Sequence, residues 1–547
     1  MNTKASWKDI VGVVLLLAGV VMLGISVFLC FSGDIWYDEL FTMGLAGQSL
    51  SELTAITAAD VHPPFYYMIV KLFLGIFGAE GSGIEQVVIA KLVSVLPFLL
   101  CMLYAVTKIR KYFGMFSAGL YFFLLISMPQ MAEYTVEIRM YGYAFFFVTA
   151  GMLHAYELTE ISPNKRKRAF QWIILTLYAL AACYTHYFAC VAACMIYVYL
   201  LVEAWIGHCV KQRIGPLLLS GAVCASGYMP WLVTAVVSQV RTVKENYWIQ
   251  PLSIRTLGGC VKFLFRPAMG QEMLSNAVAV ILCLLYGLGF AVWIWRSVRI
   301  RGDWQERRKL VFSAGCIGVL AGIIVFGFLV SALVRPIFVY RYMLPAAGVF
   351  WLAFSIMLGE HLNSEQAVFE NRVSGHMASE HMRSKLRTGK IAGTAVILFL
   401  LIVGIRNYRS FYGEEMWKRV HMQEVENALA RIEPDDILLF NFDQMQAVAS
   451  YYLGNDSWLW YGNPEPLICR MYPYNHSLVE GDFEDQAGIA KIQELLGTGR
   501  RVWFLGSGMA REEIIQKWEA EGINVYEESS MLLERYWFNI YSVKNTF

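Results

Sequence analysis

The sequence predicts a polytopic α-helical membrane protein that carries a small α/β domain at its C-terminal end. Of its 547 residues, 57% are hydrophobic and only 16% are charged, and the mean hydropathy is +0.47. Such a chain is too apolar to fold as an ordinary water-soluble globule. The 45 basic and 43 acidic residues leave a net charge of +2, so no overall field points to a nucleic-acid partner.

About eleven segments are long and apolar enough to cross the roughly 30 Å of hydrocarbon in a bilayer. They lie near 10–31, 87–107, 112–129, 140–158, 169–185, 187–206, 214–237, 275–295, 310–333, 343–359 and 391–405. The first one lacks a small-residue cleavage site, so we expect a retained span rather than a signal peptide. Segment 65–77 reaches only about 20 Å at about 1.5 Å per residue and contains Lys71, which predicts an interfacial or re-entrant helix.

Basic clusters orient the spans. If 65–77 does not cross and the N-terminus is cytoplasmic, five basic clusters fall inside the cell, as the positive-inside rule requires. These clusters lie at 108–111, 165–168, 211–213, 296–309 and 383–390. Counting 65–77 as a span would move all five outside. The sequence therefore predicts a cytoplasmic N-terminus, an extracytoplasmic C-terminal domain and an outer face on which most chemically versatile residues gather.

The composition becomes that of a soluble domain from about residue 406. Short buried strands are expected at 437–440, 501–506 and 537–543, and helices near 414–431, 484–496 and 509–521. The polar stretch 360–390 is expected to be a cytoplasmic loop with some helix. We therefore predict a transmembrane domain over 1–405, which includes an outer loop at 32–86, and an α/β domain over 406–547.

Two adjacent carboxylates, Asp38 and Glu39, stand in the loop after the first span. Adjacent carboxylates repel, and in a partly desolvated loop one of them gains proton affinity, which suits a general base. The alternative is a helix cap, in which Asp38 heads a helix and Glu39 occupies its first turn. The flanking Trp36, Tyr37 and Phe41 favour a position at the membrane interface, where chemistry on a lipid-linked substrate is possible.

Other outer-face residues have both functional and structural interpretations. His62 stands before two prolines at a rigid corner, and His186 lies in a tight turn where it could satisfy a backbone carbonyl. Arg139 and Arg341 begin spans on the outer side, where an arginine can clamp a phosphate or simply snorkel to the interface. Glu137 could belong to a solvated helical face together with Glu133, which lies four residues earlier.

The order of these motifs is informative. After the Asp-Glu pair come His-Pro-Pro-Phe-Tyr-Tyr at 62–67, Glu-Ile-Arg-Met-Tyr at 137–141, Thr-His-Tyr-Phe at 185–188 and Tyr-Arg-Tyr-Met-Leu-Pro at 340–345. Over roughly residues 8–405 the chain resembles the GT-C membrane glycosyltransferases. The resemblance is to bacterial members of the family-39 type, akin to protein O-mannosyltransferases and the lipid A aminoarabinose transferase.

The resemblance implies an inverting transfer of a sugar from a polyprenyl-phosphate donor to an envelope glycan, lipid or protein outside the cytoplasmic membrane. Within such a family the loop aspartate is the base, a role that falls on Asp38 with Glu39 in support. The donor phosphate would be bound by Arg139, Arg341 and His62, although the aminoarabinose transferase has a lysine where this chain has His62. The predicted topology puts three further residues on the same outer face, where we expect them at the site: Glu137, His186 and Tyr340.

A metal ion remains possible, because Asp38, His62, Glu137 and His186 are all of ligand type, but their spacing forms no recognised metal motif. Two other function classes are open. One is a transporter or flippase for a lipid-linked saccharide, although such proteins place ionisable groups near the bilayer midplane. The other is a non-catalytic binder of a polyprenyl lipid, in which the α/β domain recognises the ligand.

Overall fold

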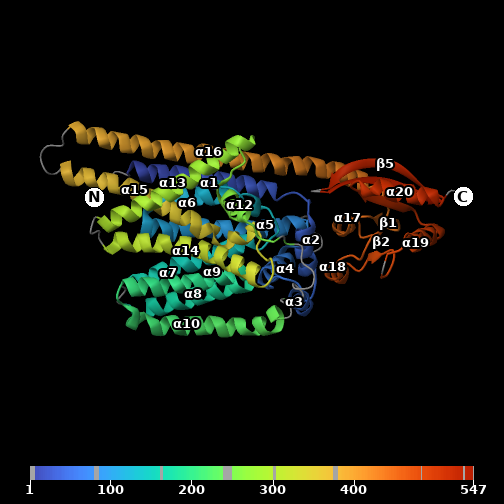
Figure 1. The fold of residues 1–547 in the computed structure, drawn as a ribbon, viewed down its shortest axis with the longest axis horizontal. Coiled ribbons are helices and arrows are strands. Elements are labelled where there is room, and N and C mark those ends of the chain that lie inside the picture. Colours follow the sequence, from blue (N-terminus) through green and yellow to red (C-terminus); the bar gives the residue numbers. More distant parts are fainter. Residues whose placement is uncertain are drawn as a thin grey trace. The chain divides into compact units, whose positions relative to one another are not determined.

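The computed structural model describes residues 6–78, 85–160, 164–237, 239, 249, 251–299, 304–373, 380–481, 483–533 and 536–545. They form two compact units (Figure 1). The first unit comprises residues 1–30, 61–66 and 91–412, and the second comprises 31–60, 67–90 and 413–547. The second unit is thus assembled from the first loop and the C-terminal part of the chain. The domain boundary at 405/406 stays a prediction.

The first unit is a bundle of long helices, and all eleven predicted spans lie on helices. The helices are α1 (Trp7–Leu29), α5 (Gln86–Tyr104), α6 (Arg110–Ser127), α7 (Tyr141–Thr159), α8 (Lys165–Thr185), α9 (Tyr187–Ile206), α10 (Val210–Trp231), α12 (Ile254–Phe265), α13 (Glu272–Arg299), α14 (Trp304–Leu333), α15 (Ala347–Val373) and α16 (Glu380–Leu429). Within the described part of the chain, eight helical segments are long and apolar enough to cross a membrane. The chain is a multi-pass membrane protein.

Glycines shape two places in this bundle. Residues 86–127 contain two predicted spans, and the helix is interrupted near the start of the second one at Gly114, whose φ of +87° is a conformation that glycine adopts without strain. Helix α1 packs against α6 where Gly12 and Gly119 bring the two backbones together. A side chain at Gly119 would overlap the backbone carbonyl of Gly12.

The predicted short helix is α4, which runs over Phe65–Phe77 and is too short to rank among the candidate spans. Its single lysine, Lys71, donates a hydrogen bond to the carbonyl oxygen of Ala46 at 3.2 Å. That contact lies within the second unit. The lysine that argued against a membrane span therefore ties α4 to the helices of the first loop.

The second unit contains a six-stranded sheet in the order β3-β2-β1-β4-β6-β5. Strands β3 (Asn475–Ser477), β2 (Ser457–Leu459), β1 (Ile437–Phe440) and β4 (Val502–Ser507) are parallel, and β6 (Tyr536–Asn545) and β5 (Ile523–Leu533) add an antiparallel edge. The helices are α2 (Tyr37–Gly47), α3 (Leu50–Ala59), α17 (Asp443–Leu453), α18 (Pro466–Met471), α19 (Asp485–Gly497) and α20 (Ala510–Ala520). Trp460, Phe504 and Trp518 are fully buried in the core.

The three predicted strands and the helices near 484–496 and 509–521 are confirmed as β1, β4, β6, α19 and α20. The predicted helical stretch at 414–431 is also confirmed, as the end of the 50-residue helix α16. The stretch 360–390 was expected to be a cytoplasmic loop with some helix. Its described residues all lie in α15 and α16, because polar residues with good helix propensity continue the apolar spans.

Candidate functional site

The predicted site residues fall in both units. His62, Arg139, His186 and Arg341 belong to the first unit, and Asp38 with Glu39 belongs to the second.

His186 joins two helices, because it ends α8 and is the N-cap of α9. Its Nδ1 accepts a hydrogen bond from the backbone N–H of Phe188 at 3.1 Å. Since a backbone N–H only donates, Nδ1 carries no proton and a neutral ring must carry its proton on Nε2. The sequence suggested that this side chain satisfies a backbone carbonyl, and that was wrong, because it satisfies an N–H group instead.

Positive charge surrounds this buried imidazole. Burial, followed by the fields of His62, Arg139 and Arg341, holds the pKa of His186 well below its ordinary value of 6.5. The rings of His62 and His186 lie 6.1 Å apart between centroids. The structure therefore brings three of the predicted residues, His62, Arg139 and Arg341, close to a fourth, His186.

Arg139 reaches this place from the segment between α6 and α7. Its side chain is only 4% exposed, and its guanidinium lies 6.0 Å from the ring centroid of Tyr141. A backbone hydrogen bond of 2.8 Å from its N–H to the carbonyl of Glu137 tightens the turn. A buried arginine is costly to desolvate, so its retention here points to an electrostatic role.

Glu137 does not lie on a long solvated helical face. The local helix is one 3-10 turn, Glu133–Thr135, in which Tyr134 is buried. Burial raises the pKa of Tyr134 well above its ordinary value, Glu137 raises it further, and Arg341 acts in the opposite direction. Glu137 and Arg341 thus act in opposite directions on the same phenol, and Arg341 also acts on His186.

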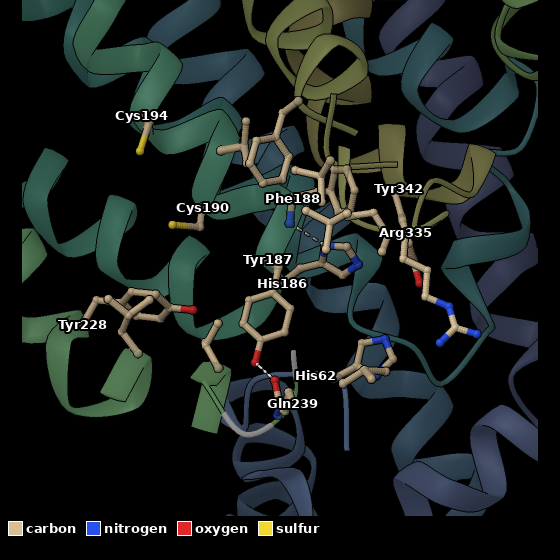
Figure 2. A pocket seen from close by; sticks show the side chains of 18 residues that line it. His62, His186, Tyr187, Phe188, Cys190, Cys194, Tyr228, Gln239, Arg335 and Tyr342 are labelled. Carbon is tan, nitrogen blue, oxygen red and sulfur yellow. Dashed lines mark hydrogen bonds between the residues drawn. The ribbon is translucent and has the colours of Figure 1, made fainter. Parts of the chain in front are cut away.

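A cavity of about 450 Å³ opens next to His186. Most of its wall is apolar and comes from α9, α10, α14 and the segment that follows α14. His62, His186 and Arg335 lie toward one end, and Tyr228 and Cys190 lie toward the other (Figure 2). The cavity therefore combines a long apolar wall with an end that holds the cationic Arg335, an arrangement suited to an amphipathic anion.

Arg335 was missed in the sequence, although it offers a signal. It stands immediately before Pro336 at the end of a span, the same kind of rigid corner that drew attention to His62. Tyr342 was also missed as a lining residue, and its ring meets that of His186 edge-on at 5.3 Å. Arg335 and Tyr342 are distant from His186 in the sequence and lie near it only in the folded protein.

Tyr340 contacts α12 rather than the cavity wall. Its ring stacks on Phe263 at 6.4 Å between centroids, and its hydroxyl occupies the space that a side chain at Gly259 would need. About a third of its surface is exposed. The residue therefore packs helix α12 against the segment that carries Arg341.

In the second unit, Asp38 and Glu39 occupy the first turn of α2, which begins at Tyr37. The positive end of the helix dipole favours both charges there. Glu39 is only 4% exposed, and its Oε2 accepts a hydrogen bond from the backbone N–H of Trp36 at 3.2 Å. Asp38 is half-buried. The helix-cap interpretation thus applies to Glu39, whereas Trp36, and not Asp38, heads the helix.

Among the residues that the structure describes, no three histidine, cysteine, aspartate or glutamate side chains are arranged to hold a metal ion.

No protein-family model and no curated protein matches the chain. Among solved structures, ArnT from Cupriavidus metallidurans in the apo state is 13% identical, with a TM-score of 0.56 over 98% of each chain. The same protein bound to undecaprenyl phosphate gives 13% identity and a TM-score of 0.52 over 97% of each chain. The archaeal oligosaccharyltransferase AglB from Archaeoglobus fulgidus, with an inhibitory peptide and a dolichol-phosphate, is 11% identical, with a TM-score of 0.48 over 95% of this chain and 73% of that chain. Over nearly its whole length, the chain therefore has the GT-C membrane glycosyltransferase fold seen in ArnT.

Proposed function

We propose that the protein transfers a sugar, with inversion, from a polyprenyl-phosphate sugar to an acceptor outside the cytoplasmic membrane. The observation that carries this proposal is the apolar cavity of about 450 Å³ whose one end holds Arg335 and the neutral His186, with Arg139 and Arg341 acting on that histidine. An isoprenoid chain suits the apolar wall, and a phosphate suits the cationic end. That a protein with the same fold binds undecaprenyl phosphate supports this ligand class.

The reaction needs two kinds of group. As the bond between the anomeric carbon and the phosphate oxygen breaks, negative charge grows on the departing lipid phosphate, and we assign Arg139 and Arg341, with a smaller contribution from His62, to stabilise that charge. The acceptor hydroxyl attacks the anomeric carbon from the opposite face. We assign its proton to the carboxylate of Asp38, because the resemblance gives the loop aspartate that role and a carboxylate is a suitable base.

Glu39 supports Asp38 indirectly in this proposal. Its carboxylate caps the backbone of Trp36 and so fixes the first turn of α2, in which Asp38 lies. Glu137, His186 and Tyr340 are assigned to the surroundings of the donor rather than to proton transfer. The outer face is their proposed location, and reporter fusions after residues 160 and 405 test it, since a reporter after 160 should be cytoplasmic and one after 405 extracytoplasmic.

The central experiment compares Asp38→Asn with Glu39→Gln in the full-length protein. Asp38→Asn should abolish sugar transfer while expression and undecaprenyl phosphate binding stay normal. Glu39→Gln should keep most of the activity, because the amide oxygen can still accept the N–H of Trp36. Near-normal turnover in Asp38→Asn would refute the base assignment. Equal inactivity of both variants would mean that both carboxylates take part in the chemistry.

The substrates themselves are best found in the cell. A deletion strain should lack one envelope glycan, glycolipid or glycoprotein modification that returns with the wild-type gene and not with Asp38→Asn. Mass spectrometry of the envelope identifies the sugar and the acceptor together. Restoration by Asp38→Asn would count against a catalytic function and in favour of transport or lipid binding.

A further inference from the structure

Two tyrosines from the C-terminal part of the second unit hold the segment that carries Asp38. We propose that Tyr452 and Tyr472 are positioning residues for this carboxylate, so that the α/β domain is required for turnover and not only for recognising an acceptor. This inference rests on the proposed function, because it assumes that Asp38 is the base. All the contacts that support it lie within the second unit.

Tyr452, on α17, bridges the backbone that leads into α2. Its hydroxyl accepts a hydrogen bond from the N–H of Ile35 at 2.8 Å and donates one to the carbonyl oxygen of Gly33 at 3.2 Å. One hydroxyl thereby uses both its donor and an acceptor position on the same segment of backbone, at Gly33 and Ile35. Ile35 is fully buried, so its N–H has poor access to water as a replacement partner.

Tyr472, at the end of α18, holds the segment on the other side of Asp38. Its hydroxyl donates a hydrogen bond of 3.0 Å to the carbonyl oxygen of Leu40, two residues after Asp38. Gly44 makes this approach possible, because a Cβ atom there would lie 2.9 Å from Tyr472 Cε2 and from Met471 Sδ. A glycine inside a helix costs about 1 kcal/mol relative to alanine. The close contact with Tyr472 and Met471 explains why a glycine stands at position 44.

The two contacts bracket the carboxylate. Backbone anchors lie three to five residues before Asp38 and two residues after it, and both come from the same α/β domain. Together with the cap by Glu39, they fix where the first turn of α2 begins and how it is rotated about its axis. A misplacement of about 1 Å in a reacting group costs about 100-fold in rate, so such anchors control turnover without touching the substrate.

The same interface supplies a matched control. Arg470 forms an ion pair of 2.5 Å with Glu52, but Glu52 lies on α3 rather than α2, and both side chains are exposed. Exposed ion pairs contribute little free energy. Tyr526, on β5, is 52% exposed and tests the loss of a tyrosine hydroxyl elsewhere in the domain.

The test measures kcat and KM for the lipid-linked donor in full-length Tyr452→Phe, Tyr472→Phe and the double variant, with Arg470→Gln and Tyr526→Phe as controls. We expect kcat to fall about tenfold or more in the double variant, while KM and undecaprenyl phosphate affinity stay within about twofold of wild type. Hydrogen–deuterium exchange over residues 33–44 should be faster in the double variant only. The controls should match wild type in kcat, KM, undecaprenyl phosphate affinity and hydrogen–deuterium exchange.

Unchanged kcat together with unchanged exchange in the double variant would overturn the inference. So would a loss of kcat in the double variant that is matched by Arg470→Gln, because this would indicate a general effect of the interface. Asp38→Asn is measured in parallel. An active Asp38→Asn refutes the base assignment of the proposed function, whereas an inactive Asp38→Asn beside fully active tyrosine variants refutes only the positioning role.

Discussion

Replacing His186 should separate two roles that one imidazole fills. Its Nδ1 caps α9 by accepting the N–H of Phe188, and the same bond leaves the proton of the neutral ring on Nε2, where it can be donated to a phosphate oxygen. His186→Asn keeps an acceptor suited to an N-cap but loses the distant Nε2 donor, because the asparagine side chain is shorter. His186→Ala loses both groups.

The magnitudes follow from these contacts. Loss of the cap should lower the free energy of unfolding by about 1 kcal/mol in His186→Ala and by little in His186→Asn. A hydrogen bond to a charged group contributes about 1.5–3 kcal/mol, and each 1.4 kcal/mol is a factor of about ten. Both variants should therefore bind undecaprenyl phosphate about 10- to 100-fold more weakly than wild type.

The pH dependence has a defined sign. Burial and the nearby positive groups hold the pKa of His186 below its ordinary 6.5, so the unfolded chain binds the extra proton more readily than the folded protein. The stability contribution is complete above pH 6.5 and is lost as the pH falls toward the lower folded pKa. His186→Asn lacks this group, so its stability should decline less steeply on acidification.

Thermal unfolding and lipid-phosphate titration of the purified protein, each between pH 5 and 8, measure these effects. Any inflection that His186 gives to wild-type donor affinity should lie well below pH 6.5. Two results would refute the reasoning: undiminished lipid-phosphate affinity in His186→Asn, or equal losses of unfolding stability in the asparagine and alanine variants. The first result would mean that Nε2 donates no hydrogen bond to the lipid phosphate. The second would mean that the cap of α9 does not account for the loss of stability.

Three further predictions concern other parts of the molecule. Arg341→Ala should weaken undecaprenyl phosphate binding by about tenfold or more, and unchanged affinity would reduce Arg341 to an interfacial anchor. Asp436→Asn should destabilise the α/β domain, because the buried carboxylate accepts two hydrogen bonds from Arg501 at 2.8 and 2.9 Å. Burial opposes that charge, but Arg501 and other donors outweigh it and lower the pKa of Asp436, so this stabilisation is present at neutral pH and is lost below about pH 4, as acid unfolding should show. Gly119→Val should reduce the yield of folded protein in detergent, whereas Gly24→Val should not, because a side chain at Gly24 meets nothing within 4 Å.

Much of the fold was predictable because apolar length is a strong signal. Each of the eleven expected spans lies on a helix. Segment 65–77 was correctly predicted to be too short to rank with them. Strands β2, β3 and β5 were missed. Strands β2 and β3 have only three residues each, too few to show a period of two. The join of 414–431 to α16 was missed because a change in composition does not end a helix.

The site was less predictable, because it depends on contacts between distant residues. The predicted topology put His62, Arg139, His186 and Arg341 on one face of the membrane, and in the structure the other three lie near His186. The direction of the His186 hydrogen bond was wrong because a sequence cannot distinguish a ring that donates from one that accepts. Nothing local in the sequence relates Tyr452 or Tyr472 to Asp38, since these contacts span more than 400 residues.

That separation has a consequence for biosynthesis. Ile35 and Tyr452 are 417 positions apart. At about 5–20 residues per second, the ribosome therefore synthesises Tyr452 about 20 to 80 s after Ile35. During that time α2 and α3 lack the surface against which they finally pack. The unit that carries Asp38 thus completes its fold only near the end of translation, and a nascent chain stalled after its last span would be fully inserted but inactive.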